Sequence, residues 1–313
     1  IAITNQKGGV GKTTTCVNLA ASLSVTRRNV LLIDLDPQGN ATMGSGVDKH
    51  NLQWSGYHLL LEETPVEQII VRAEAAGYDL LPGNSDLTAA EVQLFQSQDR
   101  EARLRQRLQP VADRYDYILI DCPPSLNMLT LNALTASHAV FIPIQCEYYA
   151  LEGLSALLET VEQIRSAVNP QLEIEGLLRT MFDARNNLAN QVSEQLLQHF
   201  GDSVYRTIIP RNIRLAEAPV TAHRSLNMTA RRAVRSPIWR WLQRWYAGAM
   251  KPSSRPPGRW HRRDYPLITT QVYTDQDYGS KKTRTGSGVG CPAGPGKGTV
   301  DQSGAAGADC RSR

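Results

Sequence analysis

The sequence predicts an α/β protein built on a mostly parallel, doubly wound sheet, and three observations lead to that prediction. The first 219 residues alternate between short apolar runs and amphipathic stretches of helical length, as in chains whose parallel strands are joined by right-handed crossover helices. A glycine-rich loop stands between the first apolar run and the first amphipathic stretch, and two later apolar runs end in aspartates. Ligands of such sheets bind where the strands end, so these loops form the expected site.

The individual elements follow from the same alternation. The run at 30–34 is apolar almost continuously, which is typical of a parallel strand with both faces buried. We see no signal peptide in this sequence and no apolar run long enough to span a bilayer, and we expect neither. The five cysteines lack metal-ligand spacing, which fits a reducing cytoplasm. The expected strands lie near 1–4, 30–34, 78–81, 117–121, 139–144, 174–181 and 204–209, and helices lie near 12–23, 151–168 and 187–200.

The loop KGGVGKTT at residues 7–14 has the composition of a phosphate-binding loop. Glycines let the backbone curl so that successive N–H groups converge on an anion at the start of a helix. Lys12 would neutralise the β and γ phosphates of a nucleotide, and the hydroxyl of Thr13 suits Mg²⁺, which prefers oxygen ligands. The expected nucleotide-binding residues are Lys7, Gly8, Gly9, Val10, Gly11, Lys12, Thr13 and Thr14.

The loop departs from the ordinary pattern G-x-x-x-x-G-K-[ST], because Gln6 occupies the position of the first glycine and Lys7 follows it. A basic residue just ahead of the loop cannot easily reach the phosphates of its own nucleotide. We therefore expect Lys7 to cross a dimer interface and to meet the nucleotide of a second subunit. The alternative is a solvated surface lysine.

Two strand ends carry the expected catalytic and metal-binding carboxylates. The run at 30–36 ends in Asp34 and Asp36, and we expect Asp36 to orient the attacking water. The run at 117–121 ends in Asp121, which would hold Mg²⁺ through water, as the acidic residue after a hydrophobic strand does in phosphate-loop proteins. A single Asp at a strand end is more often a helix cap, but the phosphate loop followed by these two segments, in this order, favours a site.

These motifs resemble those of the ParA/Soj branch of the deviant Walker-A ATPases, which are phosphate-loop NTPases, from residue 1 to about 219. The stretches 145–153, 180–185 and 209–219 match the same family. By this resemblance, Pro210 and Asn212 belong to a loop that contacts adenine. Arg185 and Arg214 belong to a surface that holds DNA without sequence preference, and their alternative role is that of solvated surface charges.

The resemblance implies an ATPase with ATP and Mg²⁺ as cofactors, which segregates chromosomes or plasmids. ATP would be sandwiched in a homodimer that binds nucleoid DNA nonspecifically in the cytoplasm. A ParB-like partner would stimulate hydrolysis and release the DNA, and no membrane partner is expected. One alternative is a MinD-like ATPase that binds membranes, suggested by the basic aromatic segment 237–246. A metabolic enzyme of the same fold ranks last, because no substrate domain or iron–sulfur cysteine pair is visible.

The composition changes after residue 219, which divides the chain into an ATPase domain at 1–219 and a basic tail at 220–313. The tail holds 17 basic and 5 acidic residues, a net charge of +12, whereas residues 1–219 hold 17 basic and 25 acidic residues, a net charge of −8. Beyond residue 251 the tail is rich in Gly, Pro, Ser and Arg, a composition that predicts disorder.

A single-base frameshift near Pro219 explains the tail. With permitted codons, the shifted frame reads SHGTSLVEYDR after Pro219, which resembles the family sequence at this point, and the shifted frame at 232–245 gives an alanine-rich helix. We therefore interpret the tail as missense sequence that replaces the last strand and the last helix of the domain. The start at Ile1, without Met, indicates a fragmentary or mis-started gene.

Overall fold

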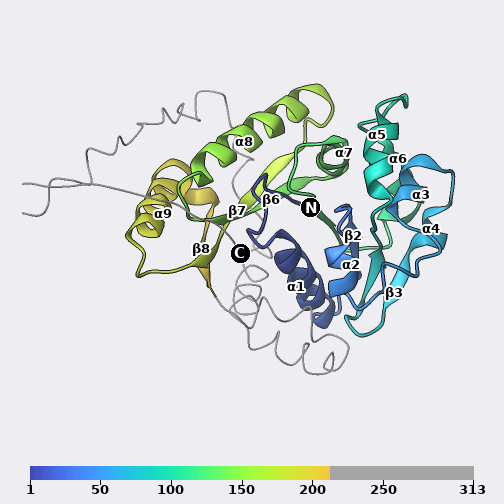
Figure 1. Cartoon of the computed structure of the whole chain (residues 1–313), viewed down its shortest axis with the longest axis horizontal. Coiled ribbons are helices and arrows are strands. Elements are labelled where there is room, and N and C mark those ends of the chain that lie inside the picture. The colour runs from blue at the N-terminus through green and yellow to red at the C-terminus, as the bar shows by residue number, and fades with distance from the viewer. Residues whose placement is uncertain (212–313) are drawn as a thin grey trace, which may run out of the picture. The chain divides into compact units, whose positions relative to one another are not determined.

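A computed structural model describes residues 1–211, and the predicted tail, Asn212 and Arg214 lie outside the described residues. The described part contains one eight-stranded sheet (Figure 1). Its strands are β1 (Ala2–Ile3), β2 (Val30–Asp34), β3 (Val71–Ala73), β4 (Tyr78–Leu81), β5 (Tyr117–Asp121), β6 (Ala139–Gln145), β7 (Glu173–Phe182) and β8 (Val204–Pro210).

The strand order is β3-β4-β2-β5-β1-β6-β7-β8. β3 runs antiparallel to β4 at one edge, and every other neighbouring pair is parallel. The mostly parallel α/β fold predicted from the sequence is thus confirmed. The seven strands expected from the apolar runs are all present, and β3 is an additional strand that the sequence did not predict.

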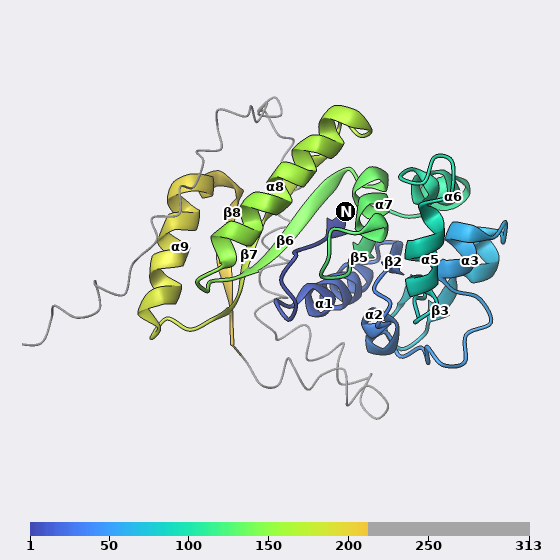
Figure 2. The same cartoon turned by 45° about the horizontal axis from the view of Figure 1, so that its top comes forward.

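Helices cover both faces of the sheet. They are α1 (Lys12–Val25), α2 (Asn40–Gly44), α3 (Gly56–Leu61), α4 (Val66–Ile69), α5 (Leu87–Leu94), α6 (Arg103–Ala112), α7 (Met128–Ala136), α8 (Ala150–Ala167) and α9 (Asn187–Phe200). The views in Figures 1 and 2 show α1 and α8 on opposite sides of the central strands.

The side chains of the central strands alternate between two cores, one on each face of the sheet. Leu31 and Ile33 of β2 pack in the larger core beneath α3 to α9, whereas Val30 and Leu32 pack in a smaller core with α1. All five residues of β2 are buried, because a central parallel strand is covered on both faces. This packing fixes the carboxyl ends of the strands, where the site lies.

Candidate nucleotide and magnesium site

The phosphate loop connects β1 to α1 in the conformation that its glycines allow. Gly9 and Gly11 have φ angles of 74° and 89°, a left-handed conformation that strongly favours glycine. Gly11 is the N-cap of α1, and within the described chain this helix start has no side-chain cap and no acidic residue in its first turn. Its first N–H groups and the positive end of the helix dipole are therefore available to an anion.

Lys12 lies inside this loop rather than in solvent. Its side chain is buried, and Nζ donates a hydrogen bond to the carbonyl of Lys7 at 3.0 Å. Burial lowers the pKa of Lys12, while Asp121 and Asp36 act in the opposite direction. A buried ammonium group with carboxylates nearby is suited to neutralise a phosphate that enters the loop.

Thr13 and Asp121 meet where the sequence predicted a magnesium site. Asp121 stands opposite both Ile3 of β1 and Asp34 of β2 in the sheet, so it lies at the same strand edge as the phosphate loop. The hydroxyl of Thr13 donates to Oδ2 of Asp121 at 2.7 Å. The second oxygen of Asp121, Oδ1, is buried without a hydrogen-bond partner among the described residues.

This arrangement fits a bound cation. Asp121 is fully buried, and burial, followed by the charge of Asp34, raises the pKa of its carboxyl well above the usual range. Residues 1–211 contain no group of three or more His, Cys, Asp or Glu side chains that could hold a metal. Mg²⁺ is commonly held by one or two protein oxygens together with substrate phosphates and water. The unpaired oxygen of Asp121 and the adjacent hydroxyl of Thr13 meet that requirement.

Asp36 follows β2 and is held by its neighbours. Its N–H donates to Oδ1 of Asp34 at 3.2 Å, and its own Oδ1 accepts from the N–H of Gln38 at 2.9 Å. Asp36 is only 8% exposed. Asp34 is fully buried, and burial raises its pKa to about 6. The sequence identified both aspartates but gave no role to Asp34, which holds the backbone of Asp36.

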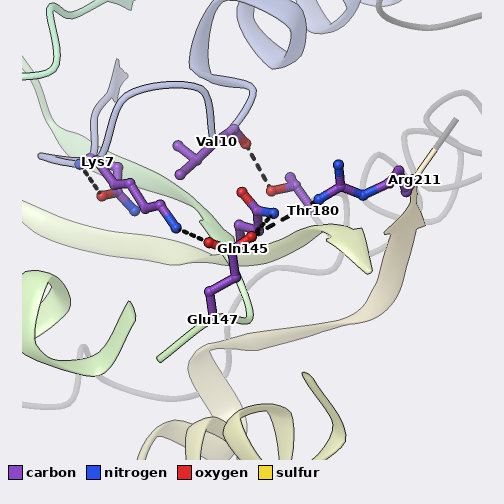
Figure 3. Close-up of polar contacts among 7 residues, drawn as sticks. Lys7, Val10, Gln145, Glu147, Thr180 and Arg211 are labelled. Carbon is purple, nitrogen blue, oxygen red and sulfur yellow. Dashed lines mark hydrogen bonds and ion pairs between the residues drawn. The ribbon is translucent and has the colours of Figure 1, made fainter. Parts of the chain in front are cut away.

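Lys7 extends from the loop to the end of β6, where it forms an ion pair with Glu147 (Figure 3). Gln145 donates its side-chain amide to the other oxygen of the same carboxylate. Arg211 approaches that oxygen at 4.0 Å from the end of β8. Glu147 thus lies between cations from two sides of the site, a position that the sequence did not predict, although residues 145–153 matched the family.

A further contact anchors the phosphate loop to β7. The hydroxyl of Thr180 donates to the carbonyl of Val10 at 2.8 Å, and both residues are buried (Figure 3). The next residue, Met181, has a φ angle of 49°, a conformation that costs about 1–2 kcal/mol for a residue with a side chain. The end of β7 thus holds the phosphate loop through Thr180 and continues into a residue with an unfavourable backbone conformation. The sequence analysis assigned no role to Thr180.

The remaining predicted residues take no part in the contacts described above or lie beyond the described chain. Pro210 ends β8 and is exposed. Arg185 is also exposed, and its guanidinium makes two hydrogen bonds with the carboxylate of Asp183, at 3.0 and 2.9 Å. This pairing lowers the pKa of Asp183 to about 2. Asn212 and Arg214 cannot be placed, because they follow the last described residue.

Comparisons with known proteins show the family of this chain. Residues 1–174 match the AAA domain family. Soj, a sporulation initiation inhibitor protein of Bacillus subtilis, is 54% identical over 219 residues, which cover 70% of this chain and 87% of Soj. The chain belongs to the ParA/Soj family. The chromosome partitioning protein ParA of Myxococcus xanthus is 52% identical over 219 residues, covering 70% of this chain and 77% of that protein.

An uncharacterized protein of Pseudomonas putida is 66% identical over 218 residues, covering 70% of this chain and 83% of its own length. Among solved structures, cobyrinic acid a,c-diamide synthase from Mycobacterium smegmatis, with bound ATP analog and magnesium, is 34% identical. It has a TM-score of 0.64 and covers 79% of this chain and 95% of its own. Family membership makes the chain a partitioning ATPase.

No helix among residues 1–211 is long and apolar enough to cross a membrane.

Proposed function

We propose that this ParA/Soj ATPase hydrolyses ATP with Mg²⁺ at the described site and uses the cycle to control a DNA-binding dimer. The observation that carries the first step is the buried, unpaired oxygen of Asp121 beside Thr13 and the uncapped start of α1. A phosphate group and a divalent cation together satisfy that oxygen, the loop amides and the ammonium of Lys12. The likeness to a structure with bound ATP analog and magnesium supports the same assignment.

In this proposal each residue has one task. The loop amides and Lys12 hold the β and γ phosphates, and Thr13 and Asp121 hold Mg²⁺, which neutralises charge on the phosphates. Asp36 orients a water molecule toward the γ phosphorus. The oxygen of that water forms the new bond as the bond to the ADP oxygen breaks, and the products are ADP and inorganic phosphate. Pro210 and Asn212 contact the adenine.

The ion pair between Lys7 and Glu147 supports a role for Lys7 outside its own loop. Nζ of Lys7 extends to the end of β6, and its side chain is 36% exposed. We assign Lys7 to the nucleotide of a second subunit in an ATP-bound homodimer. Four negatively charged phosphate oxygens compete effectively with a single half-exposed carboxylate for this ammonium.

DNA binding is assigned to the surface that includes Arg185 and Arg214. The exposed guanidinium of Arg185 is paired only with its near neighbour Asp183 among the contacts described, and an exposed ion pair of this kind is weak. Phosphates of nucleoid DNA replace Asp183 in the bound state, without base-specific contacts. A ParB-like partner then stimulates hydrolysis and returns the dimer to monomers.

Two variants test the nucleotide cycle. In a protein with the reading frame repaired after Pro219, Lys7→Ala is expected to bind ATP but to remain monomeric in sedimentation experiments, whereas Asp36→Ala is expected to dimerise and to hydrolyse ATP poorly. An ATP-dependent dimer of the Lys7→Ala variant would contradict the assignment of Lys7. Full hydrolysis by the Asp36→Ala variant would contradict the assignment of Asp36.

We also propose that the ATPase domain ends near residue 219 and that residues 220–313 result from a frameshift. Because this segment has a large excess of positive charge, it binds DNA by charge alone. DNA binding by the chain as written therefore does not report on the ATPase domain, and three proteins must be compared. The samples are the chain as written, residues 1–219, and a protein with SHGTSLVEYDR after Pro219. ATP-dependent DNA binding is expected only in the last, and ATP-independent, salt-sensitive binding in the first.

A further inference from the structure

Helix α2 begins directly after the loop that carries Asp36, and its start is capped from another element. The N-cap residue is Gly39, which has no side chain to accept a hydrogen bond. Instead, Oδ2 of Asp34 accepts hydrogen bonds from both the N–H and the hydroxyl of Thr42, each at 2.7 Å. Thr42 and Asp34 are both fully buried. A carboxylate from β2 therefore replaces the usual capping side chain of this helix.

The hydroxyl of Thr42 also connects this helix to a third segment. Its oxygen accepts a hydrogen bond from the N–H of Gly83, in the loop after β4, at 2.9 Å. The hydroxyl thus donates to Asp34 and accepts from Gly83, so it uses its donor and one acceptor position. Among residues 1–211, no other side chain hydrogen-bonds to both the carboxylate of Asp34 and the N–H of Gly83.

The three segments approach so closely that side chains cannot fill the space between them. A Cβ added to Gly39, whose φ angle is 59°, would lie 2.7 Å from the carbonyl oxygen of Gly83. A Cβ added to Gly83 would overlap the carbonyl oxygen of Asp34. Contacts this close leave the backbone little freedom to shift, and the hydrogen bonds of Thr42 determine its alignment.

The other oxygen of Asp34 transmits this alignment to Asp36. Oδ1 of Asp34 accepts the N–H of Asp36 at 3.2 Å, and the carbonyl of Asp36 accepts the N–H of Gly39 at 2.8 Å. Both polar groups of the Asp36 backbone are thus held by the unit formed by Asp34, Gly39, Thr42 and Gly83. Rotation of the Asp34 carboxylate would move the backbone of Asp36.

We propose that Thr42 is a positioning residue for ATP hydrolysis, which orients Asp34 and thereby holds Asp36 in place. This inference rests on the proposed role of Asp36 in orienting water. Catalytic groups displaced by about 1 Å can lose roughly 100-fold in rate, so a buried hydroxyl two contacts away from Asp36 affects the rate without touching ATP. A residue that only stabilises the fold would affect stability without a selective effect on hydrolysis.

The test compares three variants of the full chain. Thr42→Val keeps the shape of the side chain and removes the hydroxyl, whereas Thr42→Ser keeps the hydroxyl. The matched control is Ser45→Ala, one turn later in the same region, which removes a buried hydroxyl that contacts Ala41 and Tyr78 at 2.7 Å but not Asp34. Each protein is assayed for binding of a fluorescent ATP analogue and for single-turnover hydrolysis.

Thr42→Val is expected to bind the analogue within about twofold of wild type and to hydrolyse ATP roughly 10- to 100-fold more slowly. Thr42→Ser and Ser45→Ala are expected to hydrolyse within about twofold of wild type. Adding Thr42→Val to Asp36→Ala should cause no further loss, because the two residues act as a unit. A lower hydrolysis rate in the double variant than in Asp36→Ala, or a large decrease in the hydrolysis rate of Thr42→Ser, would overturn the proposal.

Hydrogen exchange supplies a readout that does not need turnover. The amide of Gly83 should exchange slowly in wild type, because it donates to Thr42 inside the protein, and much faster in Thr42→Val. Amides of β5 and β6 should keep their protection, which shows that the variant is folded. If Asp36→Ala hydrolyses normally, the proposed role of Asp36 fails. If Asp36→Ala is inactive while Thr42→Val matches wild type in hydrolysis and exchange, only the role of Thr42 fails.

Discussion

Thr180→Val should loosen the phosphate loop without changing any residue of the loop itself. The hydroxyl of Thr180 donates to the carbonyl of Val10 at 2.8 Å, and the two residues are 4% and 1% exposed. Valine has nearly the same shape, so packing is retained while the donor is lost. Depriving a buried carbonyl of its donor costs about 1–3 kcal/mol. For a domain of this size that corresponds to a decrease in Tm of roughly 2–12 °C.

The nucleotide affinity should fall as well, because the carbonyl of Val10 lies within the loop whose amides face the phosphates. Part of the binding free energy is then used to order the loop. Every ~1.4 kcal/mol used in this way weakens the Kd tenfold. Thermal unfolding followed by circular dichroism measures the Tm, and titration with a fluorescent ATP analogue measures the Kd.

Thr180→Ser is the control, because it keeps the hydroxyl that donates to the carbonyl of Val10. We expect the serine variant to retain the ATP affinity of wild type, with a modest loss of stability from the missing methyl group. If Thr180→Val unfolds at the wild-type Tm and binds the analogue with unchanged affinity, the contact between β7 and the loop has no energetic role.

Four further outcomes are expected from the same structure. Lys12→Ala should abolish ATP binding in calorimetric titration, because phosphate charge is no longer neutralised, and an unchanged Kd would contradict the site. Burial first, and a neighbouring carboxylate second, raise the pKa of Asp121, so wild type loses stability as the pH rises through that pKa. Asp121→Asn should lack this loss when urea unfolding is compared at several pH values, and equal pH dependence would refute the reasoning. Gly153→Ala should stabilise the protein by about 0.5–1 kcal/mol in urea unfolding, since a Cβ there meets nothing within 4 Å in the described chain. Glu147→Gln should release Lys7 and lower the ATP concentration needed for dimerisation roughly two- to fivefold in sedimentation, and a difference that persists in 1 M salt would argue against an ionic cause.

The sequence predicted the elements whose physical signal is local. Continuous apolar runs located the central strands, because burial on both faces leaves no room for polar residues. The glycine-rich loop and the aspartates at strand ends predicted the positions of Lys12, Thr13 and Asp121, since parallel strands place their carboxyl ends at one edge. The short edge strand β3 (Val71–Ala73) was missed, because three residues in a half-exposed antiparallel pair give almost no alternation.

The contacts that complete the site could not be predicted in the same way. Glu147 pairs with Lys7 across 140 positions of sequence, and Thr180 contacts Val10 across 170. Such pairs depend on the strand order and on side-chain rotamers, which no local pattern encodes. Thr42 resembles any polar residue in a short helix, and its link to Asp34 and Gly83 becomes visible only when the three segments are brought together.

The position of β1 in the sheet has a consequence for how the protein folds. Ala2 lies opposite Ile120 of β5 on one side and opposite Val140 of β6 on the other. Both partners come more than a hundred residues later in the chain, so β1 must wait for its neighbours during synthesis. At about 5–20 residues per second, a ribosome needs roughly 7–28 s to go from Ala2 to Val140. Closing so long a loop is slow. The phosphate loop is therefore encoded long before β6 completes its surroundings, and nascent chains that stop before β6 should be unable to bind ATP.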